Sequence, residues 1–271
     1  MTELRTRPRR SYSRLDTWQS CPQAYKAKYV DKIPEEPSVW SVGGTAFHTV
    51  AEKLLRGDLG DDPDEAALFY AWLEAFRSAY EDVVRHPRFV GDPDMRTWRK
   101  ANRGTEDQDW WVAEGLRMVE RFARWRKTTG RQLTVFDLDG RPALETQIEV
   151  ELGGVPFIAI PDALVVDEYG QLGILDYKTG KPPKKPTQLN VYAAVLAEKY
   201  QLHATWGLYY MARPGQLLPR LLDQDHTELI AEIVEFDERE RAGFYNAQGS
   251  DACRFCPYKK QHCSLYNPEN A

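Results

Sequence analysis

A strand that ends in an acidic residue and a lysine is the most restrictive feature of this sequence. It occupies residues 173–180, where an apolar run is followed by Asp176, Tyr177 and Lys178 and is closed by a segment rich in glycine and proline. Side chains on a strand alternate between its two faces, so Asp176 and Lys178 point to one side and Tyr177 to the other. A carboxylate and an ammonium group placed together at a strand end cost desolvation free energy. The stretch therefore predicts a functional site at one end of a sheet.

The charge of the chain is moderate overall but locally concentrated. Its 271 residues are enough for one large domain, and the net charge of −5 argues against a uniformly basic nucleic-acid binder. Residues 1–14 nevertheless contain five arginines, and residues 178–185 contain four lysines. A basic track on an acidic body can hold phosphates, although solvated loop charge explains the N-terminal arginines equally well. Since neither an export signal nor a run of about 20 apolar residues occurs, we expect a cytoplasmic protein without membrane association.

The hydrophobic pattern predicts an α/β fold, in which helices flank a small mixed sheet and a cysteine-containing loop follows at the C-terminus. Apolar residues recur at every fourth position in much of residues 61–130, which predicts a helical insertion within a single domain of residues 1–271. The aromatic residues of this insertion are expected to lie in the core. Other helices are expected near residues 13–21, 43–55, 187–200 and 225–246, and strands near 144–152, 155–167, 173–178, 203–213 and 217–222.

Two acidic residues and a lysine suggest a metal site. Asp162 precedes Asp176 by 14 positions, and a strand, a turn and a returning strand of this length can bring both acids to one part of a sheet. Carboxylates are the ligands that Mg²⁺ prefers, and such a metal polarises a phosphodiester and lowers the pKa of bound water. Lys178 can orient that water and offset developing negative charge. Glu145, an acid on the preceding strand, is expected to be solvated.

Two short motifs give the sequence its likeness to a known family. Pro161 and Asp162 stand one strand before the triplet Asp176-Tyr177-Lys178, so the chain contains Pro-Asp followed by Asp-x-Lys. This pattern resembles that of the PD-(D/E)XK nuclease superfamily and, within it, the RecB-like exonucleases. The resemblance implies a restriction-endonuclease-like core. It also implies that Asp162, Asp176 and the Tyr177 carbonyl bind Mg²⁺ or Mn²⁺ and that Lys178 activates the attacking water.

Two helical motifs extend the resemblance. His48 lies four residues after Gly44 and four before Glu52, as in the upstream motif of the RecB-like family, which implies that His48 is a further metal ligand that favours Mn²⁺. Gln188 and Tyr192 match the Gln-x-x-x-Tyr element of that family. Their spacing puts both on one helix face, where they can contact the DNA backbone or brace the active site. Taken alone, His48 is an ordinary packed or surface histidine.

The segment after the strand is basic. Lys181, Lys184 and Lys185 follow Lys178 closely and are expected to bind DNA phosphates together with Gln188 and Tyr192. Binding through such contacts should weaken as the salt concentration rises.

Four cysteines favour a metal centre over disulfides. Cys253, Cys256 and Cys263 lie in one C-terminal segment, whereas Cys21 is more than 200 residues upstream. Disulfides are not expected in a chain without an export signal. Four thiolates can hold either tetrahedral Zn²⁺ or an iron–sulfur cluster, and their spacing does not decide between the two.

The division into one N-terminal and three C-terminal cysteines is similar to the iron staple of AddB and of the CRISPR-associated RecB-like exonucleases of the Cas-four family. The resemblance implies a [4Fe–4S] cluster held by residues 11–30 and 250–265. Structural Zn²⁺ is the alternative, with His262 as an optional ligand. Either centre would clip the two ends of the chain together across the nuclease core.

These motifs together predict a Mg²⁺- or Mn²⁺-dependent DNA exonuclease that acts on single-stranded DNA or on free DNA ends. By family analogy the direction is 5′→3′, and the setting is recombination, repair, phage DNA metabolism or CRISPR adaptation, with a protein partner from such a pathway. No phosphate-binding loop of the helicase type occurs, so DNA unwinding is not expected. The alternative is a DNA-end-binding subunit of a larger complex, and an RNA nuclease also stays open.

Overall fold

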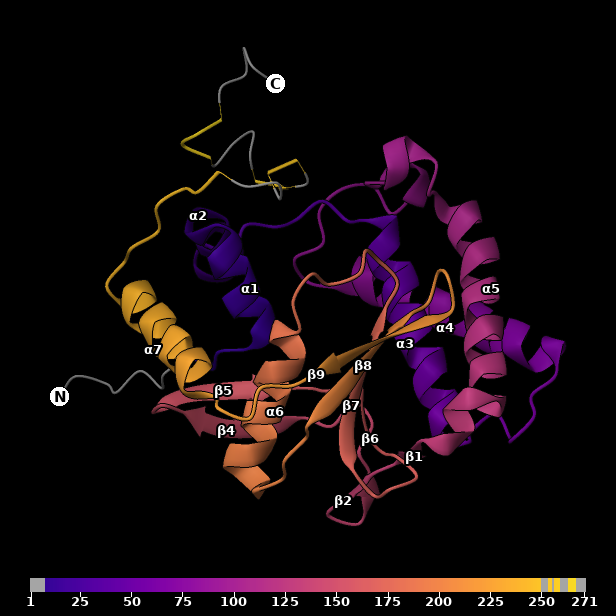
Figure 1. The fold of residues 1–271 in the computed structure, drawn as a ribbon. Coiled ribbons are helices and arrows are strands. Elements are labelled where there is room, and N and C mark those ends of the chain that lie inside the picture. Colours follow the sequence, from indigo (N-terminus) through magenta and orange to yellow (C-terminus); the bar gives the residue numbers. More distant parts are fainter. Residues whose placement is uncertain (1–7, 250–252, 255, 259–262, 267–271) are drawn as a thin grey trace.

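A five-stranded sheet lies between two groups of helices in the computed structural model of the protein (Figure 1). The structure describes residues 8–249, 253–254, 256–258 and 263–266. The helices are α1 (Tyr12–Ser20), α2 (Pro22–Tyr25), α3 (Val39–Arg56), α4 (Glu65–Arg85), α5 (Gln108–Lys127), α6 (Thr187–Tyr200) and α7 (Thr227–Arg241), with a π-helical turn at Lys26–Val30 and 3-10 turns at Met95–Thr97, Asn102–Gly104 and Thr129–Gln132. The strands are β1 (Thr134–Val135), β2 (Asp137–Leu138), β3 (Arg141–Pro142), β4 (Ile148–Leu152), β5 (Val155–Ala159), β6 (Ala163–Val166), β7 (Leu172–Lys178), β8 (Trp206–Met211) and β9 (Gln216–Leu221).

The main sheet is mixed, as the sequence predicts. Its strand order is β1-β6-β7-β8-β9, and β7 is parallel to β8 whereas the other pairs are antiparallel. Parallel neighbours need a crossover connection, which α6 supplies between β7 and β8. The strand that ends in Asp176 and Lys178 therefore lies in the middle of the sheet. This arrangement confirms the predicted α/β fold.

One face of the sheet is covered by α3, α4 and α5. Trp72, Trp111 and Phe122 from α4 and α5 are buried in one cluster with Tyr177 of β7 and Tyr210 of β8. Asp64 and Asp107 cap α4 and α5 by accepting hydrogen bonds from main-chain N–H groups of the first helical turn, at 2.8 and 3.0 Å. Residues 61–130 are therefore largely helical, and their aromatic side chains contribute to the core, as predicted.

Helix α3 begins at Val39, four residues before the start that the sequence suggested. Val39 and Val42 face the core, which extends the apolar stripe beyond the two glycines inside the helix. A Cβ atom at Gly43 would lie 2.0 Å from the Trp111 ring. The glycine is therefore required for the close approach of α5 and does not mark the helix start.

The opposite face packs against α1, α6, α7 and a separate β4–β5 hairpin. The expected strand over residues 144–152 begins only at Ile148, and the hairpin forms its own two-stranded sheet. The predicted turn at Gly153 and Gly154 is confirmed, with φ of +57° and +76°. The expected strand over 155–167 is interrupted at residues 160–162, as Pro161 and Asp162 predict. This break separates β5 from β6 and places Asp162 beside the end of β7.

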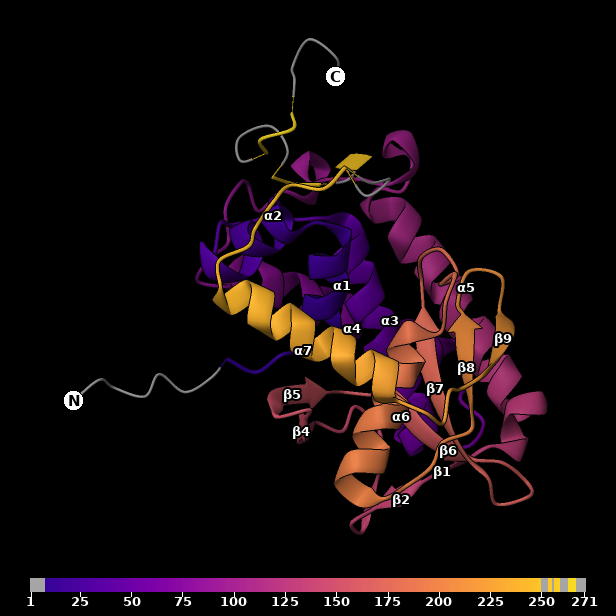
Figure 2. The ribbon, with the colours of Figure 1, turned by 60° about the vertical axis from the view of Figure 1, so that its left-hand side comes forward.

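The N-terminal segment runs beside β5 and near α7 (Figure 2). Arg10 is fully buried, and its guanidinium forms ion pairs with Asp237 and Glu240 of α7 at 2.7 Å each. Its Nη1 also donates to the Tyr25 hydroxyl at 3.0 Å. Arg10 is therefore unavailable to phosphates, which corrects the expectation of one basic track. The arginines of residues 1–7 lie outside the described residues.

The described helices include none with the length and apolar character needed to cross a membrane.

Candidate functional site

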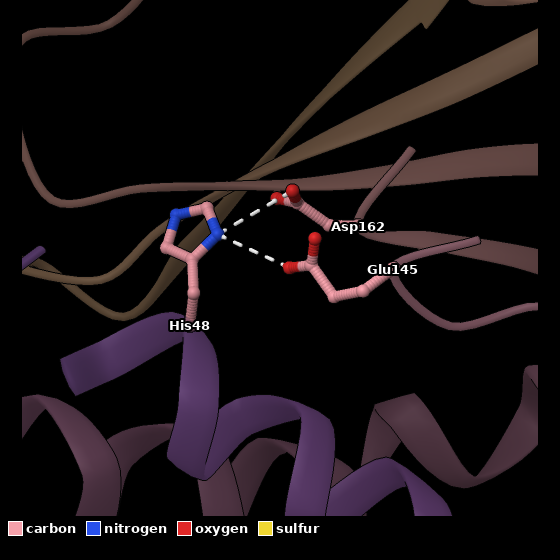
Figure 3. Close-up of side chains that lie close together, drawn as sticks. All are labelled: His48, Glu145 and Asp162. Atoms are coloured by element: carbon pink, nitrogen blue, oxygen red, sulfur yellow. Dashed lines mark ion pairs between the residues drawn. The ribbon is translucent and has the colours of Figure 1, made fainter. Parts of the chain in front are cut away.

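Three metal-ligating side chains from distant parts of the chain converge beside β7 (Figure 3). His48 projects from α3 toward Glu145 and Asp162, and the ligand atoms of all three lie within 4.8 Å of one another. His48 Nδ1 is 3.4 Å from Asp162 Oδ1 and 3.6 Å from Glu145 Oε1. Imidazole nitrogen and carboxylate oxygen are suitable ligands for Mn²⁺, and the carboxylates also suit Mg²⁺.

Main-chain hydrogen bonds hold the two acids in place. The Tyr177 N–H donates to Asp162 Oδ2 at 2.6 Å, which ties the carboxylate to the next residue after Asp176. The Glu145 N–H donates to the Asp162 carbonyl at 3.0 Å. Glu145 adopts a φ of +45°, which is unusual for a residue with a side chain. The backbone thus orients the Asp162 carboxylate and fixes the main chain of Glu145 beside it.

The position of Glu145 corrects the sequence interpretation. We expected a solvated strand residue, but Glu145 lies in a bend before β4, and its side chain is only 33% exposed. Its carboxylate belongs to the same group as His48 and Asp162. The alternation of residues 145–152 suggested a continuous strand and hid the bend. An acidic residue directly before a strand that precedes the Pro-Asp motif is the signal that could have revealed it.

A second chain of contacts joins four of the predicted residues on the α6 side of the sheet. Lys178 Nζ lies 2.5 Å from Asp176 Oδ2, so the two side chains share a face as predicted. Lys178 Nζ also donates to Gln188 Oε1 at 2.8 Å, and Gln188 Nε2 donates to the Tyr192 hydroxyl at 2.8 Å. Tyr192 is only 6% exposed. Of the two roles suggested for Gln188 and Tyr192, the geometry favours bracing Lys178.

The positive charges near the site do not fully compensate its carboxylates. Burial raises the pKa of Asp176 to about 7, and the charge of Asp162 adds to this effect while Lys178 opposes it. Apart from the Lys178 ammonium beside Oδ2, the carboxylate oxygens of Asp176 have no hydrogen-bond donor among the described residues. Burial alone would lower the pKa of His48, but the charge of Asp162 and hydrogen bonds to Asp162 and Glu145 raise it to about 10. The residues therefore fit a divalent cation, which would satisfy Asp176 and replace the proton on His48.

A cavity of about 370 Å³ opens at His48 and is also lined by Thr45, Thr49, Glu52 and Glu145 among others. A larger groove of about 530 Å³ adjoins it, and Thr45 lines both. The loop after β7 carries Lys181, Lys184 and Lys185, all exposed. Tyr177 points its side chain into the core, where the edge of its ring packs against the His48 ring with the centroids 5.4 Å apart.

Cys21 lies directly before α2, whereas Cys253, Cys256 and Cys263 lie in the C-terminal segment, and the described residues do not bring three or more of the thiols within 4.8 Å of one another. Burial raises the pKa of the Cys256 thiol, and the charges of Cys21, Cys253 and Cys263 act in the same direction. The Ser264 N–H and hydroxyl both donate to Gln23 Oε1, at 3.3 and 3.0 Å. Both ribbon views show the chain that follows α7 rising toward the end of the molecule where α2 lies (Figures 1 and 2). His262, the optional zinc ligand, lies outside the described residues.

Comparison with known proteins decides the family. The family model described as the PD-(D/E)XK nuclease superfamily matches residues 9–263. The chain belongs to the PD-(D/E)XK nuclease superfamily. Nucleases of this superfamily use divalent metals such as Mg²⁺ or Mn²⁺, and the group of His48, Glu145 and Asp162 is a possible site for one.

Two curated relatives of this PD-(D/E)XK protein come from phages. The Gene 69 protein of Mycobacterium phage D29 is 33% identical over 267 residues, which cover 94% of this chain and 96% of the relative. The Gene 69 protein of Mycobacterium phage L5 is 32% identical over 284 residues, covering 94% and 97%. The crystal structure of SSO0001 aligns with a TM-score of 0.34 and 14% identity, over 83% of this chain and 85% of that one.

Proposed function

We propose that this PD-(D/E)XK protein is a Mg²⁺- or Mn²⁺-dependent DNA exonuclease of the RecB-like type, acting on single-stranded DNA or free DNA ends. The carrying observation is that His48, Glu145 and Asp162 converge at the end of the strand that bears the buried Asp176–Lys178 pair. A protein that only bound DNA would have no use for a buried acid with a raised pKa beside a partly exposed lysine. The 5′→3′ direction is part of the proposal by family analogy.

Each side chain has a role in this proposal. Asp162, Asp176 and His48 hold the metal, together with the Tyr177 carbonyl, and Glu145 joins them as an additional ligand. The bound metal supplies charge stabilisation and an acidified water for phosphodiester hydrolysis. Lys178 orients the attacking water and offsets negative charge, while Gln188 and Tyr192 fix the direction of its ammonium group.

The surroundings of the cavity support a path for a DNA strand. Lys181, Lys184 and Lys185 are exposed on the loop that follows β7. The groove that shares Thr45 with the cavity has Arg14 and Lys32 among its lining residues, together with the acids Glu35, Glu36 and Asp82. The cations of the loop and of the groove can contact phosphates of a bound strand. Because the two curated relatives are phage proteins, phage DNA metabolism is the setting that the comparisons support best among those considered.

The test is an assay with end-labelled and circular DNA, single- and double-stranded, in the presence of Mg²⁺ or Mn²⁺. We expect release of short products from labelled linear single strands and no cleavage of circles. Labels at the 5′ and 3′ ends separate the two directions. A wild-type protein that cleaves no DNA form with either metal would contradict the proposal and favour a DNA-end-binding subunit, and cleavage of RNA in preference to DNA would contradict the substrate.

Metal binding should depend on pH in a defined direction. In the metal-free protein Asp176 binds a proton below about pH 7 and His48 below about pH 10, and both must lose it to become ligands. The Mn²⁺ association constant should therefore rise with pH, by about 10-fold per unit between about pH 7.5 and 9 and by at least about 100-fold per unit below about pH 6. Calorimetric titration at several pH values measures this slope. His48→Ala should reduce by one the number of protons released on Mn²⁺ binding, and so should lower the slope. An affinity independent of pH from about 5 to 9 would contradict the assignment.

We further propose that Cys21, Cys253, Cys256 and Cys263 hold a [4Fe–4S] cluster. The action of the Cys21, Cys253 and Cys263 charges on the Cys256 thiol and the contacts of Ser264 with Gln23 support a common centre for both ends of the chain. When bound, the cluster supplies a covalent link between α2 and the C-terminal segment. Zn²⁺ is the alternative occupant of the same thiols.

Replacement of Cys21 tests the centre. The purified wild-type protein should be brown, with broad absorbance near ~400 nm and about four iron atoms per chain. Cys21→Ser should lose most of this iron, whereas the neighbouring substitution Ser20→Ala should retain it. Metal analysis and absorbance of anaerobically prepared protein provide the measurement. Stoichiometric zinc in a colourless wild-type preparation would contradict the cluster.

A further inference from the structure

Arg213 lies at a junction between the end of β7 and the segment 61–130. Its Nε donates to the Thr179 carbonyl at 2.5 Å, directly after Lys178. Its two terminal nitrogens donate to the two carboxylate oxygens of Glu106 at 2.8 and 2.7 Å. Glu106 is only 6% exposed, whereas the Arg213 side chain is 32% exposed, so the carboxylate is buried and the guanidinium is partly open to water. A bidentate pair of this kind fixes orientation as well as distance.

The same guanidinium packs against two tryptophan rings of α5. Its central carbon lies 4.9 Å from the centroid of the Trp110 ring and 5.5 Å from that of Trp111. Trp111 in turn packs directly on Gly43 of α3, where no Cβ atom would fit. The position of Arg213 is therefore set by α5 and by the connection before it, and its cationic plane is held between a carboxylate and aromatic faces.

The contacts of Arg213 connect it to both Lys178 and His48. Thr179 follows Lys178, and a Cβ atom at Gly44 would lie 3.3 Å from the Thr179 hydroxyl oxygen. Gly44 is one helical turn before His48 on α3. The Lys178 carbonyl accepts a hydrogen bond from the Ala212 N–H at 2.9 Å, so the residue before Arg213 is also tied to the catalytic strand. A shift of Arg213 would thus move Lys178 and His48 relative to each other.

We propose that Glu106 and Arg213 are positioning residues of the nuclease site, through which the segment 61–130 sets the separation of Lys178 and His48. The inference rests on the proposed nuclease function and extends it, since it gives this helical segment a part in the reaction. Neither residue touches the substrate. A lysine at position 213 keeps the charge but cannot reach both Glu106 oxygens and the Thr179 carbonyl in the arginine geometry.

The experiment compares Arg213→Lys, Glu106→Gln and Glu106→Ala with wild type. Arg213→Lys should lower kcat by on the order of 10- to 100-fold, because a misplacement of about 1 Å at a reacting centre has an effect of this size. DNA affinity, measured with Ca²⁺ in place of the active metal, should be unchanged. Glu106→Gln keeps one acceptor oxygen and should retain more activity than Glu106→Ala. The Mn²⁺ affinity should fall in Arg213→Lys, because His48 is displaced.

Arg10→Lys is the matched control. It also changes an arginine that pairs with carboxylates, but these carboxylates belong to α7. It should lower the melting temperature at least as much as Arg213→Lys and leave kcat and Mn²⁺ affinity unchanged. Equal kcat losses in the two variants at equal melting temperatures would overturn the positioning role. If the wild type cleaves nothing, the proposed function fails, and the Mn²⁺ titration then decides the inference, which an unchanged affinity in Arg213→Lys overturns.

Discussion

Lys178→Ala should reduce DNA cleavage by on the order of 10²- to 10³-fold or more, because in the proposed mechanism this side chain offsets negative charge in the transition state. The Lys178 side chain is 24% exposed, so it can reach a substrate, and its Nζ lies 2.5 Å from Asp176 Oδ2. The protein should stay folded. Without Lys178 the pKa of Asp176 rises further above its usual range, so at neutral pH the carboxyl takes up a proton and does not remain an isolated buried charge.

Single-turnover cleavage of an end-labelled strand in Mg²⁺ measures the loss, and circular dichroism checks the fold. Lys199→Ala is a suitable control, since it removes an exposed lysine at the far end of α6. DNA binding in Ca²⁺ should be reduced only slightly in Lys178→Ala, because neighbouring lysines contact other phosphates. Cleavage at the wild-type rate in Lys178→Ala would show that another residue supplies this charge.

Arg10→Ala should lower the free energy of unfolding by about 3–5 kcal/mol, because it leaves the buried carboxylates of Asp237 and Glu240 without their guanidinium partner. The substitution also removes the hydrogen bond to Tyr25 and the cation–π contact with Phe236, whose ring centroid is 5.1 Å from the guanidinium carbon. Urea unfolding followed by circular dichroism gives the measurement.

The expected loss of unfolding free energy comes from carboxylates left without their partner and not from the lost side-chain volume alone. A double variant, Arg10→Met with Asp237→Leu, should therefore recover part of the stability by removing a carboxylate together with its partner. Arg9→Ala provides the surface comparison, since Arg9 pairs with Glu149 at 3.0 Å while both side chains are about half exposed. It should change the free energy of unfolding by less than about 1 kcal/mol. A loss of that small size in Arg10→Ala would contradict the account of the buried network.

The sequence predicted those parts of the site that follow from local patterns. Alternation along β7 correctly placed Asp176 and Lys178 on one face and Tyr177 on the other, because the side-chain period of a strand is fixed by its backbone. The i, i+4 spacing of Gln188 and Tyr192 likewise predicted their contact on α6. The order of the motifs was enough to indicate the family.

The remainder depends on contacts between distant residues. Glu145 joined the metal-ligating group because the backbone bends at a positive φ, whereas the polar-apolar alternation around it suggested a regular strand. Arg10 became a buried ion-pair partner of a helix more than 220 residues away, which no local pattern contains. Glu106 and Arg213 lie 107 positions apart and in segments that carry no recognisable motif. Their roles became visible only when the fold brought the segments together.

The main chain and the side chain of Tyr177 contact different parts of the molecule. Its main-chain N–H holds the Asp162 carboxylate, while its aromatic ring lies on the other side of the sheet among Phe47 and Phe122. The hydrogen bond to Asp162 requires only a main-chain N–H at position 177, which every amino acid except proline provides. The side chain is held by packing against these rings and by an edge contact with the His48 ring, whose centroid is 5.4 Å away. A substitution at this position therefore also changes the support of His48, so preserving the volume of the ring is a requirement of the site as well as of the core.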